Sequence, residues 1–477
     1  MTSDFLRTRI VATLGPATCK PKVIRALIKA GTDVARINFA HSSPVDIEKL
    51  VRIVRSEASK LGRPVAIMGD LGGPKLRTGE APEGGISLVR GAKIRVFSRQ
   101  IVSSPGHIGV NLPSLTRDVK KGDRVLLNDG QICLLTTHVR PEYLTCIAKT
   151  DGIITSRRGL NLPDSKLSVP AITPFDKKCI TIAIALGFDL LALSFVRAAK
   201  DVIGLQRLLK KQNSDIPIIA KIEKPEALLD LPAIIRASYG VMVARGDLGV
   251  ELSPEKVPLV QKAILAEARR QMKPTIVATQ MMESMIEAPT PTRAEASDIA
   301  NAVFDRTDAL MLSGETAVGK YPVETVETMR RIALAAEESV LWDHKSLSPD
   351  AFETRSIIRM AAGAAVDCAA ALKARYLICY TESGRTARLL SGRRPPVPIL
   401  ALTTSPDVVR RLSISWGVFP HIMKPGKDYD STIRAVSKLL ITLGLASKGD
   451  TVVMLTGTPI QKHGLADTIK LFTVETQ

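Results

Sequence analysis

The sequence predicts an α/β protein: a (β/α)₈ TIM barrel with an inserted β-barrel lid domain and a C-terminal α/β domain. Three observations support this prediction. Eight short apolar runs are mostly separated by helix-like stretches, as in repeated βα units. The interval after the third run changes to short alternating segments with turn residues. Beyond residue 341, a second alternation of helix-like and apolar stretches begins.

The eight apolar runs are rich in Val, Ile, Leu and Ala, which is typical of strands buried on both faces. They span residues 9–14, 34–39, 65–70, 190–195, 217–222, 241–245, 275–279 and 309–313. Helix-like stretches lie at 21–30, 46–61, 175–186, 198–212 and 258–271. We therefore expect residues 1–71 and 168–341 to form one barrel, with its chemistry at the carboxyl ends of the strands.

The remaining segments predict two further domains. Between residues 72 and 167, turns are indicated at Gly84-Gly85, Lys121-Gly122-Asp123 and Asn128-Asp129-Gly130. We expect residues 72–167 to form a β domain that lies above the catalytic face as a lid. Residues 342–477 are expected to form the C-terminal α/β domain, with 342–354 as its linker. Its predicted elements are a helix at 357–373 and strands at 376–380, 398–403, 417–422 and 451–456.

Composition and charge indicate a cytoplasmic protein without a nucleic-acid or membrane partner. No apolar run reaches the roughly 18 residues of a membrane span, and the first residues lack the apolar stretch of a signal peptide. Six scattered cysteines without a CxxC pair fit reduced thiols. The formal net charge of +19 raises nucleic-acid binding as an alternative. The positive residues are spread along the chain, however, without zinc-finger spacing or an aromatic RNA-binding motif.

Two of the apolar runs end in opposite charges. Lys221 and Glu223 point to the same side of the fifth run, because side chains alternate along a strand. Arg245, Gly246 and Asp247 end the sixth run. Two carboxylates and a lysine that converge would hold a divalent metal beside a phosphate.

Polar residues end nearly every other run as well. They are Arg36, Asn38 and His41 at the second, Asp70, Lys75 and Arg77 at the third, Ser194 and Arg197 at the fourth, Thr279 at the seventh, and Ser313 and Glu315 at the eighth. A polar residue at the end of a single run usually belongs to a solvated loop. Polar groups on nearly every tip indicate a shared site for an anionic substrate.

These segments resemble the pyruvate kinase family, and the resemblance covers essentially the whole chain. The matching motifs are TLGPA at 13–17, RINFAH at 36–41, DLGGPKLR at 70–77, AKIE at 220–223, MVARGDLGVE at 242–251, ATQMMESM at 278–285, PTRAE at 291–295 and LSGETA at 312–317. The resemblance implies a lidded barrel with a C-terminal domain. It also implies a phosphotransferase of glycolysis that converts phosphoenolpyruvate and ADP to pyruvate and ATP.

The resemblance also implies roles for the substrate-binding residues. Glu223 and Asp247 would coordinate Mg²⁺ or Mn²⁺ through hard oxygen ligands. Lys221 would act on the transferring phosphoryl group as a compact charge. Arg36 would clamp the phosphate, and the backbone amides of Gly246 and Asp247 would receive the substrate carboxylate.

Two hydroxyls are implied in protonation of the enolate. Thr279 would lie near the enolate carbon, with Ser313 connected through water. The alternative is that each hydroxyl only bonds a backbone amide at the end of its strand. Arg245 is expected to orient its neighbours through a salt bridge.

The nucleotide is expected to contact residues from the barrel and the lid. The candidates are Arg77, Arg158, Asn38 and His41. Arg158 lies in the lid segment SRRGLNLP, where the family commonly has lysine. A solvated basic turn is the alternative for Arg158, and a structural loop histidine is the alternative for His41.

The chain departs from the family at the potassium site. Many relatives hold K⁺ with Asn, Ser, Asp and Thr; here Asn38 and Asp70 remain, while Ala40 and Leu71 replace the other two. Lys75 replaces the glutamate of the usual Gly-Pro-Glu. We expect the Lys75 ammonium to take the place of K⁺, so that potassium is not required.

A loop of the C-terminal domain is expected to bind a phosphorylated effector, as in the family. It follows an apolar run and opens a helix, and such a helix N-terminus attracts anions. Its candidate residues are Thr381, Ser383, Gly384, Arg385 and Thr386. Lys462 and His463 could add charge, and a capped turn without regulation is the alternative. The family also suggests a homotetramer.

Two rival functions remain. A metal-dependent barrel aldolase also works next to a pyruvate enolate, but it leaves the lid and Arg77 without a purpose and predicts no ADP requirement. A nucleic-acid-binding protein leaves Glu223, Asp247 and Thr279 unexplained.

Overall fold

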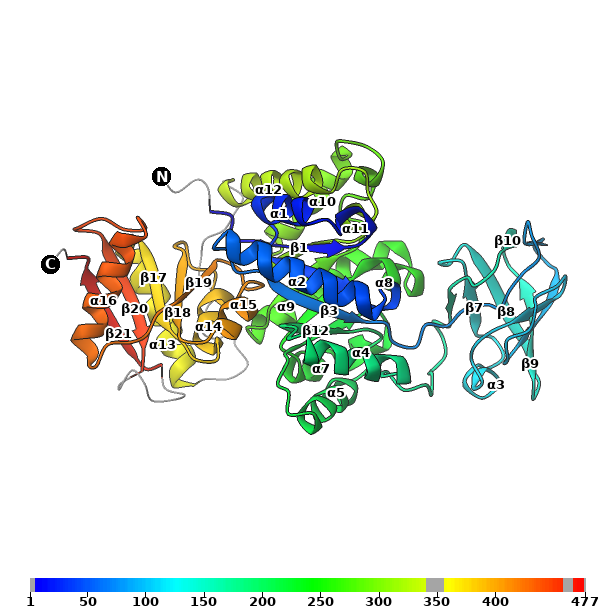
Figure 1. Ribbon diagram of the computed structural model, residues 1–477. Helices are drawn as coiled ribbons and strands as arrows, with labels where there is room; N and C mark the ends of the chain where they lie inside the picture. The colour runs from blue at the N-terminus through cyan, green and yellow to red at the C-terminus, as the bar shows by residue number, and fades with distance from the viewer. Residues whose placement is uncertain (1–4, 340–355, 458–465, 476–477) are drawn as a thin grey trace.

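The computed structural model describes residues 5–339, 356–457 and 466–475, which form three parts (Figure 1). The C-terminal α/β domain and the inserted β domain lie at opposite ends of a central barrel. The expected linker at 342–354, and Lys462 and His463, lie outside the described residues.

Parallel strands close into a barrel in the order β1-β16-β15-β14-β13-β12-β3-β2. Their bounds are Arg9–Leu14 (β1), Val34–Asn38 (β2), Ala66–Leu71 (β3), Leu190–Leu193 (β12), Ile218–Ile222 (β13), Gly240–Ala244 (β14), Thr275–Ala278 (β15) and Ala309–Leu312 (β16). Nearly every residue of these strands is buried, as expected when helices cover a barrel filled with side chains. The predicted fold class is confirmed.

Alternate residues along each strand fill the barrel or face the helices. In β1, Val11 belongs to an interior cluster to which all eight barrel strands contribute. Ile10 and Ala12 point the other way and pack with the surrounding helices. Ile414 of the C-terminal domain joins the interior cluster and closes it from one end.

Three helices of the barrel start at a side-chain N-cap, which is Ser43, Thr173 or Thr292. Thr173 with Asp176, and Thr292 with Glu295, form reciprocal capping boxes at two of these starts. The helices are Pro21–Ala30 (α1), Pro44–Lys60 (α2), Pro174–Ala185 (α4), Ala199–Lys211 (α5), Glu226–Leu229 (α6), Leu231–Ala237 (α7), Arg245–Glu251 (α8), Val257–Arg270 (α9), Arg293–Phe304 (α10), Gly314–Ala317 (α11) and Pro322–Glu338 (α12). No helix within the described ranges is both long enough and apolar enough to cross a bilayer.

Five barrel strands end one or two residues earlier than the apolar runs predict, and two of these ends have a left-handed backbone. The fourth and seventh runs were expected to continue to residues 195 and 279, but β12 ends at Leu193 and β15 at Ala278. Phe195 has φ 55° and Thr279 has φ 69°. This left-handed conformation cannot continue a strand, so the chain turns at these tips.

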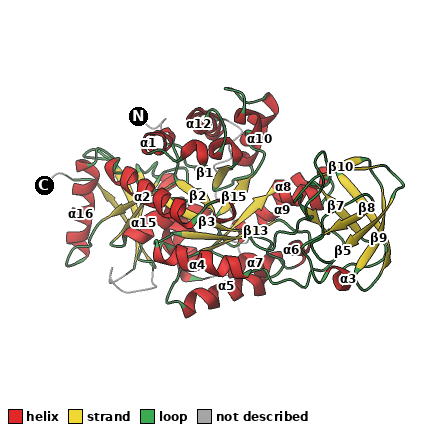
Figure 2. Cartoon of the chain, turned by 45° about the vertical axis from the view of Figure 1, so that its right-hand side comes forward, coloured by secondary structure: helices red, strands yellow, loops and turns green. Residues whose placement is uncertain are grey.

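The inserted domain is built from two small sheets with an apolar core of their own (Figure 2). The larger sheet has the order β11-β7-β8-β9-β5-β6, and β10 pairs with β4 in the other. The strands are Ile86–Leu88 (β4), Lys93–Phe97 (β5), His107–Gly109 (β6), Arg124–Leu127 (β7), Ile132–Val139 (β8), Tyr143–Ala148 (β9), Gly152–Ile154 (β10) and Leu160–Asn161 (β11), with one short helix, Leu115–Asp118 (α3).

The C-terminal domain has a sheet of order β19-β18-β17-β20-β21, in which β21 is antiparallel. Its strands are Tyr376–Tyr380 (β17), Ile399–Thr403 (β18), Val418–Ile422 (β19), Thr451–Thr456 (β20) and Thr468–Thr473 (β21). Its helices are Ile357–Ala371 (α13), Arg385–Gly392 (α14), Pro406–Leu412 (α15) and Tyr429–Thr442 (α16).

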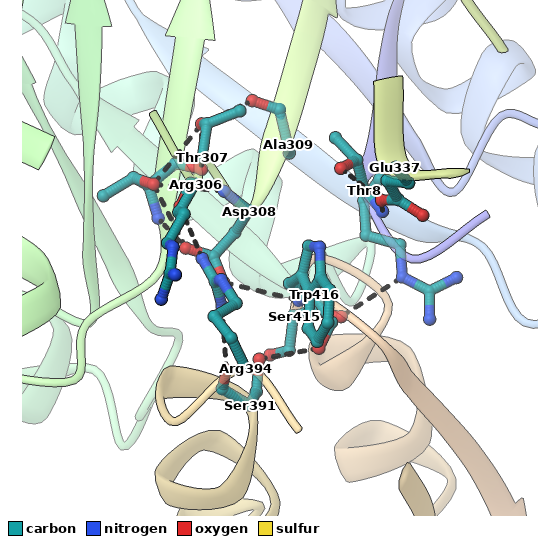
Figure 3. A network of polar contacts seen from close by, with 12 residues as sticks. Thr8, Arg306, Thr307, Asp308, Ala309, Glu337, Ser391, Arg394, Ser415 and Trp416 are labelled. Atoms are coloured by element: carbon teal, nitrogen blue, oxygen red, sulfur yellow. Dashed lines mark hydrogen bonds and ion pairs between the residues drawn. The ribbon is translucent and has the colours of Figure 1, made fainter. Parts of the chain in front are cut away.

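A buried polar network joins this domain to the amino-terminal ends of barrel strands (Figure 3). Asp308, just before β16, accepts a hydrogen bond of 3.0 Å from Arg394 Nη1 and one of 2.9 Å from the Thr275 amide. The Trp416 amide lies 3.4 Å from the same carboxylate, and Arg9 Nε donates to the Ser415 carbonyl at 3.1 Å. The domain is therefore held at the barrel face opposite the carboxyl ends of the strands.

Candidate active site

Most predicted site residues lie at one end of the barrel, because the carboxyl ends of all eight strands meet there. Arg36, Asp70 and Lys221 lie within β2, β3 and β13. Glu223, Gly246, Asp247, Thr279 and Ser313 follow the last residues of β13, β14, β15 and β16.

The Lys221 ammonium is surrounded by oxygen atoms from neighbouring strand tips. Its Nζ lies 2.7 Å from Glu223 Oε1, 2.7 Å from Ser194 Oγ and 3.3 Å from Asp70 Oδ1. Burial acts to lower the pKa of Lys221, but the charges of Asp70 and Glu223 outweigh it and raise the pKa above the ordinary lysine value. The lysine therefore keeps its charge in a buried position.

Arg36 lies beside the same aspartate. Its Nε and Nη2 are 2.8 and 2.6 Å from Asp70 Oδ2, and Nη1 donates to Thr13 Oγ1 at 2.9 Å. Burial acts to raise the pKa of Asp70, but the charges of Lys221 and Arg36 and their hydrogen bonds hold it below the ordinary value. One ionised carboxylate thus fixes two cations, which suits binding of a phosphate group.

Glu223 and Asp247 are the carboxylates best placed for a divalent metal. Glu223 is buried, and its Oε2 accepts the Phe195 amide at 2.8 Å; Asp247 is exposed in the first turn of α8. Burial raises the pKa of Glu223, Lys221 opposes this, and Asp247 adds to it. No group of three His, Cys, Asp or Glu close enough to hold a metal occurs in the described part of the chain. The oxygen donors of these two carboxylates suit a hard metal such as Mg²⁺, which commonly takes one or two carboxylates and completes its ligands from substrate and water.

The Thr279 hydroxyl lies over the Gly246 amide. Thr279 Oγ1 accepts the Gly246 N–H at 2.7 Å and donates to the Ala278 carbonyl at 2.6 Å. The amide expected to receive the substrate carboxylate is thus engaged within the chain. Arg245 pairs with Asp298 at 2.6 Å and donates to the Thr279 carbonyl at 2.8 Å, so it orients its neighbours in this structure.

Ser313 presents a buried hydroxyl without a hydrogen-bond partner among the described residues. Its amide donates to Glu315 Oε2 at 2.7 Å, and Glu315 Oε1 accepts the Met282 amide at 3.1 Å. Glu315 therefore joins the tips of β15 and β16. A buried hydroxyl of this kind is normally completed by water or a ligand.

Comparison with known proteins identifies the chain's family. Residues 5–326 match the family model described as "Pyruvate kinase, barrel domain", and residues 359–472 match "Pyruvate kinase, alpha/beta domain". The chain belongs to the pyruvate kinase family. It is a phosphotransferase, as the resemblance implied, and functions as a pyruvate kinase of glycolysis.

Relatives match along nearly the whole chain. A pyruvate kinase of Mycobacterium tuberculosis is 42% identical over 453 residues, which are 95% of each chain. One from Thermococcus litoralis is 39% identical over 472 residues, or 98% of each. The crystal structure of a pyruvate kinase from Cryptosporidium parvum superposes with a TM-score of 0.92 at 32% identity, covering 98% of this chain and 96% of that one.

Pyruvate kinases must accommodate a nucleotide, and two clefts lie where the lid meets the barrel. Their volumes are about 890 and 250 Å³, and Lys75 and Arg77 line both. Arg158 and Asp247 line the smaller cleft, so a lid residue and a carboxylate of the candidate metal site share one space. Arg158 Nε also donates to Thr155 Oγ1 within the lid.

The other two nucleotide candidates, Asn38 and His41, lie within two residues of Ala40, which lines the larger cleft. Burial, together with the charges of Lys75 and Arg77, holds the pKa of His41 below its ordinary value, so His41 lies within reach of their field. Asn38 Oδ1 accepts the Ala40 amide at 3.1 Å, which commits that oxygen to the local turn.

Lys75, the predicted replacement of K⁺, lies within the field of charged residues at the strand tips. Burial lowers its pKa, Arg77 and Lys221 lower it further, and Asp70 and Asp247 oppose them. A methyl group added to Gly72 would lie 3.4 Å from the Ala40 side chain. Ala40 therefore packs against the loop that carries Lys75.

The effector loop lies in the C-terminal domain, away from these clefts. Gly384 has φ 76°, a left-handed conformation that glycine adopts readily, and α14 starts at the next residue. Ser383 and Arg385 are exposed, whereas Thr381 and Thr386 are buried. The effector, the homotetramer and the cytoplasmic location stay predictions.

Sequence reasoning left some partners without a role. The sequence shows only that Ser194 lies at a strand tip, yet its hydroxyl accepts a hydrogen bond from Lys221. Thr13 accepts a hydrogen bond from Arg36, and Asp298 on α10 accepts one from Arg245. The sequence around Thr13 and Asp298 does not indicate these contacts. Asp176 caps α4 and also accepts the Gly73 amide at 3.2 Å, next to the predicted cation site.

Proposed function

We propose that this pyruvate kinase transfers the phosphoryl group of phosphoenolpyruvate to ADP in a Mg²⁺-dependent reaction that does not require K⁺. The bond between phosphorus and the enol oxygen breaks, a bond to the terminal ADP oxygen forms, and the resulting enolate takes a proton at its terminal carbon. The single observation that carries this proposal is the Lys221 ammonium held by Glu223 and Asp70 at the strand tips.

Lys221 and Arg36 supply the positive charge for the transferring group. Both side chains are almost buried and are fixed by Asp70, so little reorganisation is needed when the phosphate enters. Lys221 keeps its proton because its pKa is raised, and it therefore remains a cation through the transfer.

Glu223 and Asp247 would hold Mg²⁺ or Mn²⁺. When bound there, the metal neutralises negative charge on the phosphate and the enolate oxygen. The Lys221 ammonium faces Glu223 Oε1, so this ion pair must adjust when the carboxylate takes a metal.

The substrate carboxylate would bind the amides of Gly246 and Asp247 at the start of α8, where the helix dipole favours an anion. Thr279 then lies next to the reacting carbons. The partnerless hydroxyl of Ser313 supports a water-linked path for the proton. The nucleotide phosphates would contact Arg77 and Arg158, which both line the smaller cleft where the lid meets the barrel, with His41 and Asn38 as further candidates.

ATP formation from phosphoenolpyruvate and ADP, measured in a coupled assay with and without Mg²⁺, tests the reaction. We expect activity only when ADP and the divalent metal are both present. A metal-dependent lyase would act without ADP, and a well-folded protein that forms no ATP would overturn the proposal.

Potassium independence rests on Lys75. Its ammonium belongs to the chain, lines both clefts, and lies within the field of Asp70 and Asp247. Ala40 and Leu71 replace two potassium-site residues of many relatives, although Leu71 could still offer a backbone carbonyl. We propose that Lys75 serves as the internal monovalent cation.

Kinetics in Na⁺, K⁺ and tetramethylammonium salts at equal ionic strength test this role. We expect similar rates in all three salts. The variant Lys75→Glu should lose activity in Na⁺ and regain part of it in K⁺. Strong activation of the unmodified protein by K⁺ would contradict the proposal, as would full activity of the variant without K⁺.

A further inference from the structure

The loop after β15 has an unusual backbone conformation. Thr279 has φ 69° and Gln280 has φ 53°, both in the left-handed region. This region is unfavourable for a β-branched residue such as threonine, and the conformation persists only where the surrounding structure fixes it. Something nearby must therefore hold these two residues.

Arg245 supplies the contacts that hold this loop. Its Nη2 donates to the carbonyls of Thr279 and Gln280 at 2.8 and 3.1 Å, and its Nε lies 3.3 Å from the Thr279 carbonyl. Its Nη1 is 2.8 and 2.6 Å from the two carboxylate oxygens of Asp298 on α10. The guanidinium thus connects the loop after β15 to helix α10.

These contacts commit Arg245 to the protein. A guanidinium has five N–H donors, and Nε, Nη1 and Nη2 all have partners within the chain. Nη2 also lies 2.8 Å from Met281 Sδ. Arg245 therefore has little capacity left to clamp a substrate phosphate, although it lines a cleft of about 690 Å³ next to Asp247.

The clamp also determines where the Thr279 hydroxyl lies. Arg245 and Gly246 are neighbours, so one turn holds the Thr279 carbonyl through the guanidinium and the hydroxyl through an amide. If the backbone at 279–280 relaxed to an ordinary φ, the side chain and the carbonyl would both turn away from Gly246.

We infer that Arg245, oriented by Asp298, is a positioning residue for protonation of the enolate, acting through the backbone of Thr279. The inference rests on the proposed role of Thr279 in that step. It assigns Arg245 no contact with substrate and no part in binding phosphoenolpyruvate or ADP.

Exchange of the pyruvate methyl protons with deuterated water isolates the protonation step and provides the test. We expect Arg245→Lys, which keeps the charge but cannot reach both carbonyls and Asp298, to slow exchange about 10- to 100-fold. Asp298→Asn should slow it less, and KM for phosphoenolpyruvate and ADP should change by less than about threefold in both variants. Arg411→Lys, at a half-buried arginine paired with the exposed Asp215, is the matched control.

Two double variants separate positioning from a general loss of structure. Thr279→Val removes the hydroxyl, so adding Arg245→Lys to it should slow exchange no further. Gln280→Gly relieves the backbone strain at one of the two positions, so it should restore part of the exchange lost in Arg245→Lys. Thermal unfolding checks that every variant is folded.

Each other outcome overturns a defined statement. If Arg245→Lys raises KM while exchange is intact, or if the losses in the first double variant add, the positioning role is wrong. If Thr279→Val alone abolishes exchange and Arg245→Lys does not slow it, only the positioning role falls. If Thr279→Val leaves exchange unchanged, the proposed role of Thr279 fails, and the positioning role fails with it.

Discussion

The two junctions of the barrel are built in opposite ways. At the C-terminal domain, the ion pair of Asp308 and Arg394 is almost fully buried and connects strand starts to a helix end (Figure 3). At the lid, Asn161 Nδ2 lies 2.8 Å from Glu251 Oε1, and Arg197 donates to two carbonyls of the chain leaving the lid. These lid contacts lie around clefts, not across a filled interface.

The difference follows from what each end must do. A face that admits substrates cannot be filled by a dry polar network, because the space must remain available for ligands. The opposite face has no such constraint, and burial there strengthens each charge-assisted bond. The amino-terminal ends of the strands therefore serve stability, and their carboxyl ends serve reactivity. Substitutions at the amino-terminal ends should mainly change stability, and those at the carboxyl ends should mainly change activity.

The largest expected effect is at the lid end. Lys221→Met removes the cation proposed for the phosphoryl group, and we expect kcat to fall about 10³-fold or more. The coupled ATP assay measures this loss. Lys262→Met, at the surface pair with Asp305, is the matched control and should keep the unmodified rate. A Lys221 variant with nearly normal kcat would contradict the proposed role.

At the other end, Asp308→Ala should mainly reduce stability. It leaves the buried Arg394 charge without its carboxylate, so the free energy of unfolding should fall by about 3–5 kcal/mol. Denaturant unfolding measures the loss. Activity per folded molecule should stay within about threefold of the unmodified protein. A large fall in kcat without a stability change would show that the two ends are not separable.

A smaller effect is expected from pH, through Lys75. Burial and the charges of Arg77 and Lys221 hold its pKa below the ordinary lysine value, so Lys75 loses its proton earlier than a free lysine as pH rises. We therefore expect the protein to gain a K⁺ response, of about two- to fivefold, only at alkaline pH. Rates in KCl and NaCl across the pH range measure this. Lys75→Arg should abolish the alkaline K⁺ response, and a response equal at all pH values would contradict the proposal.

The smallest effect is expected at the lid contact itself. Asn161→Ala removes one hydrogen bond to Glu251, while Lys224 still pairs with that carboxylate. We expect KM for ADP to rise about two- to tenfold and the free energy of unfolding to change by less than about 1 kcal/mol. A stability loss as large as that of Asp308→Ala would mean that the lid junction carries more of the fold than its contacts indicate.

The barrel could be predicted because each strand is an apolar run buried on both faces, so its sequence differs clearly from the helices around it. Lys221 and Glu223 could be predicted because charge at the end of such a run has no packing purpose. The short helix α8 could not, since Gly246 and Gly249 are poor helix formers and give no periodic signal.

The supporting contacts of the site could not be predicted either. Ser194 and Lys221, or Arg245 and Asp298, come from different βα units, and only the closed barrel brings them together. The left-handed backbone of Thr279 is also hidden, because threonine in an apolar run favours a strand. Local sequence pattern indicates the candidate groups, while long-range packing decides how they are held.

The hydrogen bond between Gly246 and Thr279 has one more consequence. An amide has a single hydrogen to donate, so a carboxylate that binds Gly246 as proposed must compete with the Thr279 hydroxyl for it. An empty pocket keeps the Gly246 N–H on the hydroxyl, whereas a bound carboxylate would leave Thr279 Oγ1 with only its hydrogen bond to the Ala278 carbonyl. The last proton transfer would then depend on which group accepts the Gly246 N–H. Analogues that lack the carboxylate should leave this N–H bonded to the Thr279 hydroxyl.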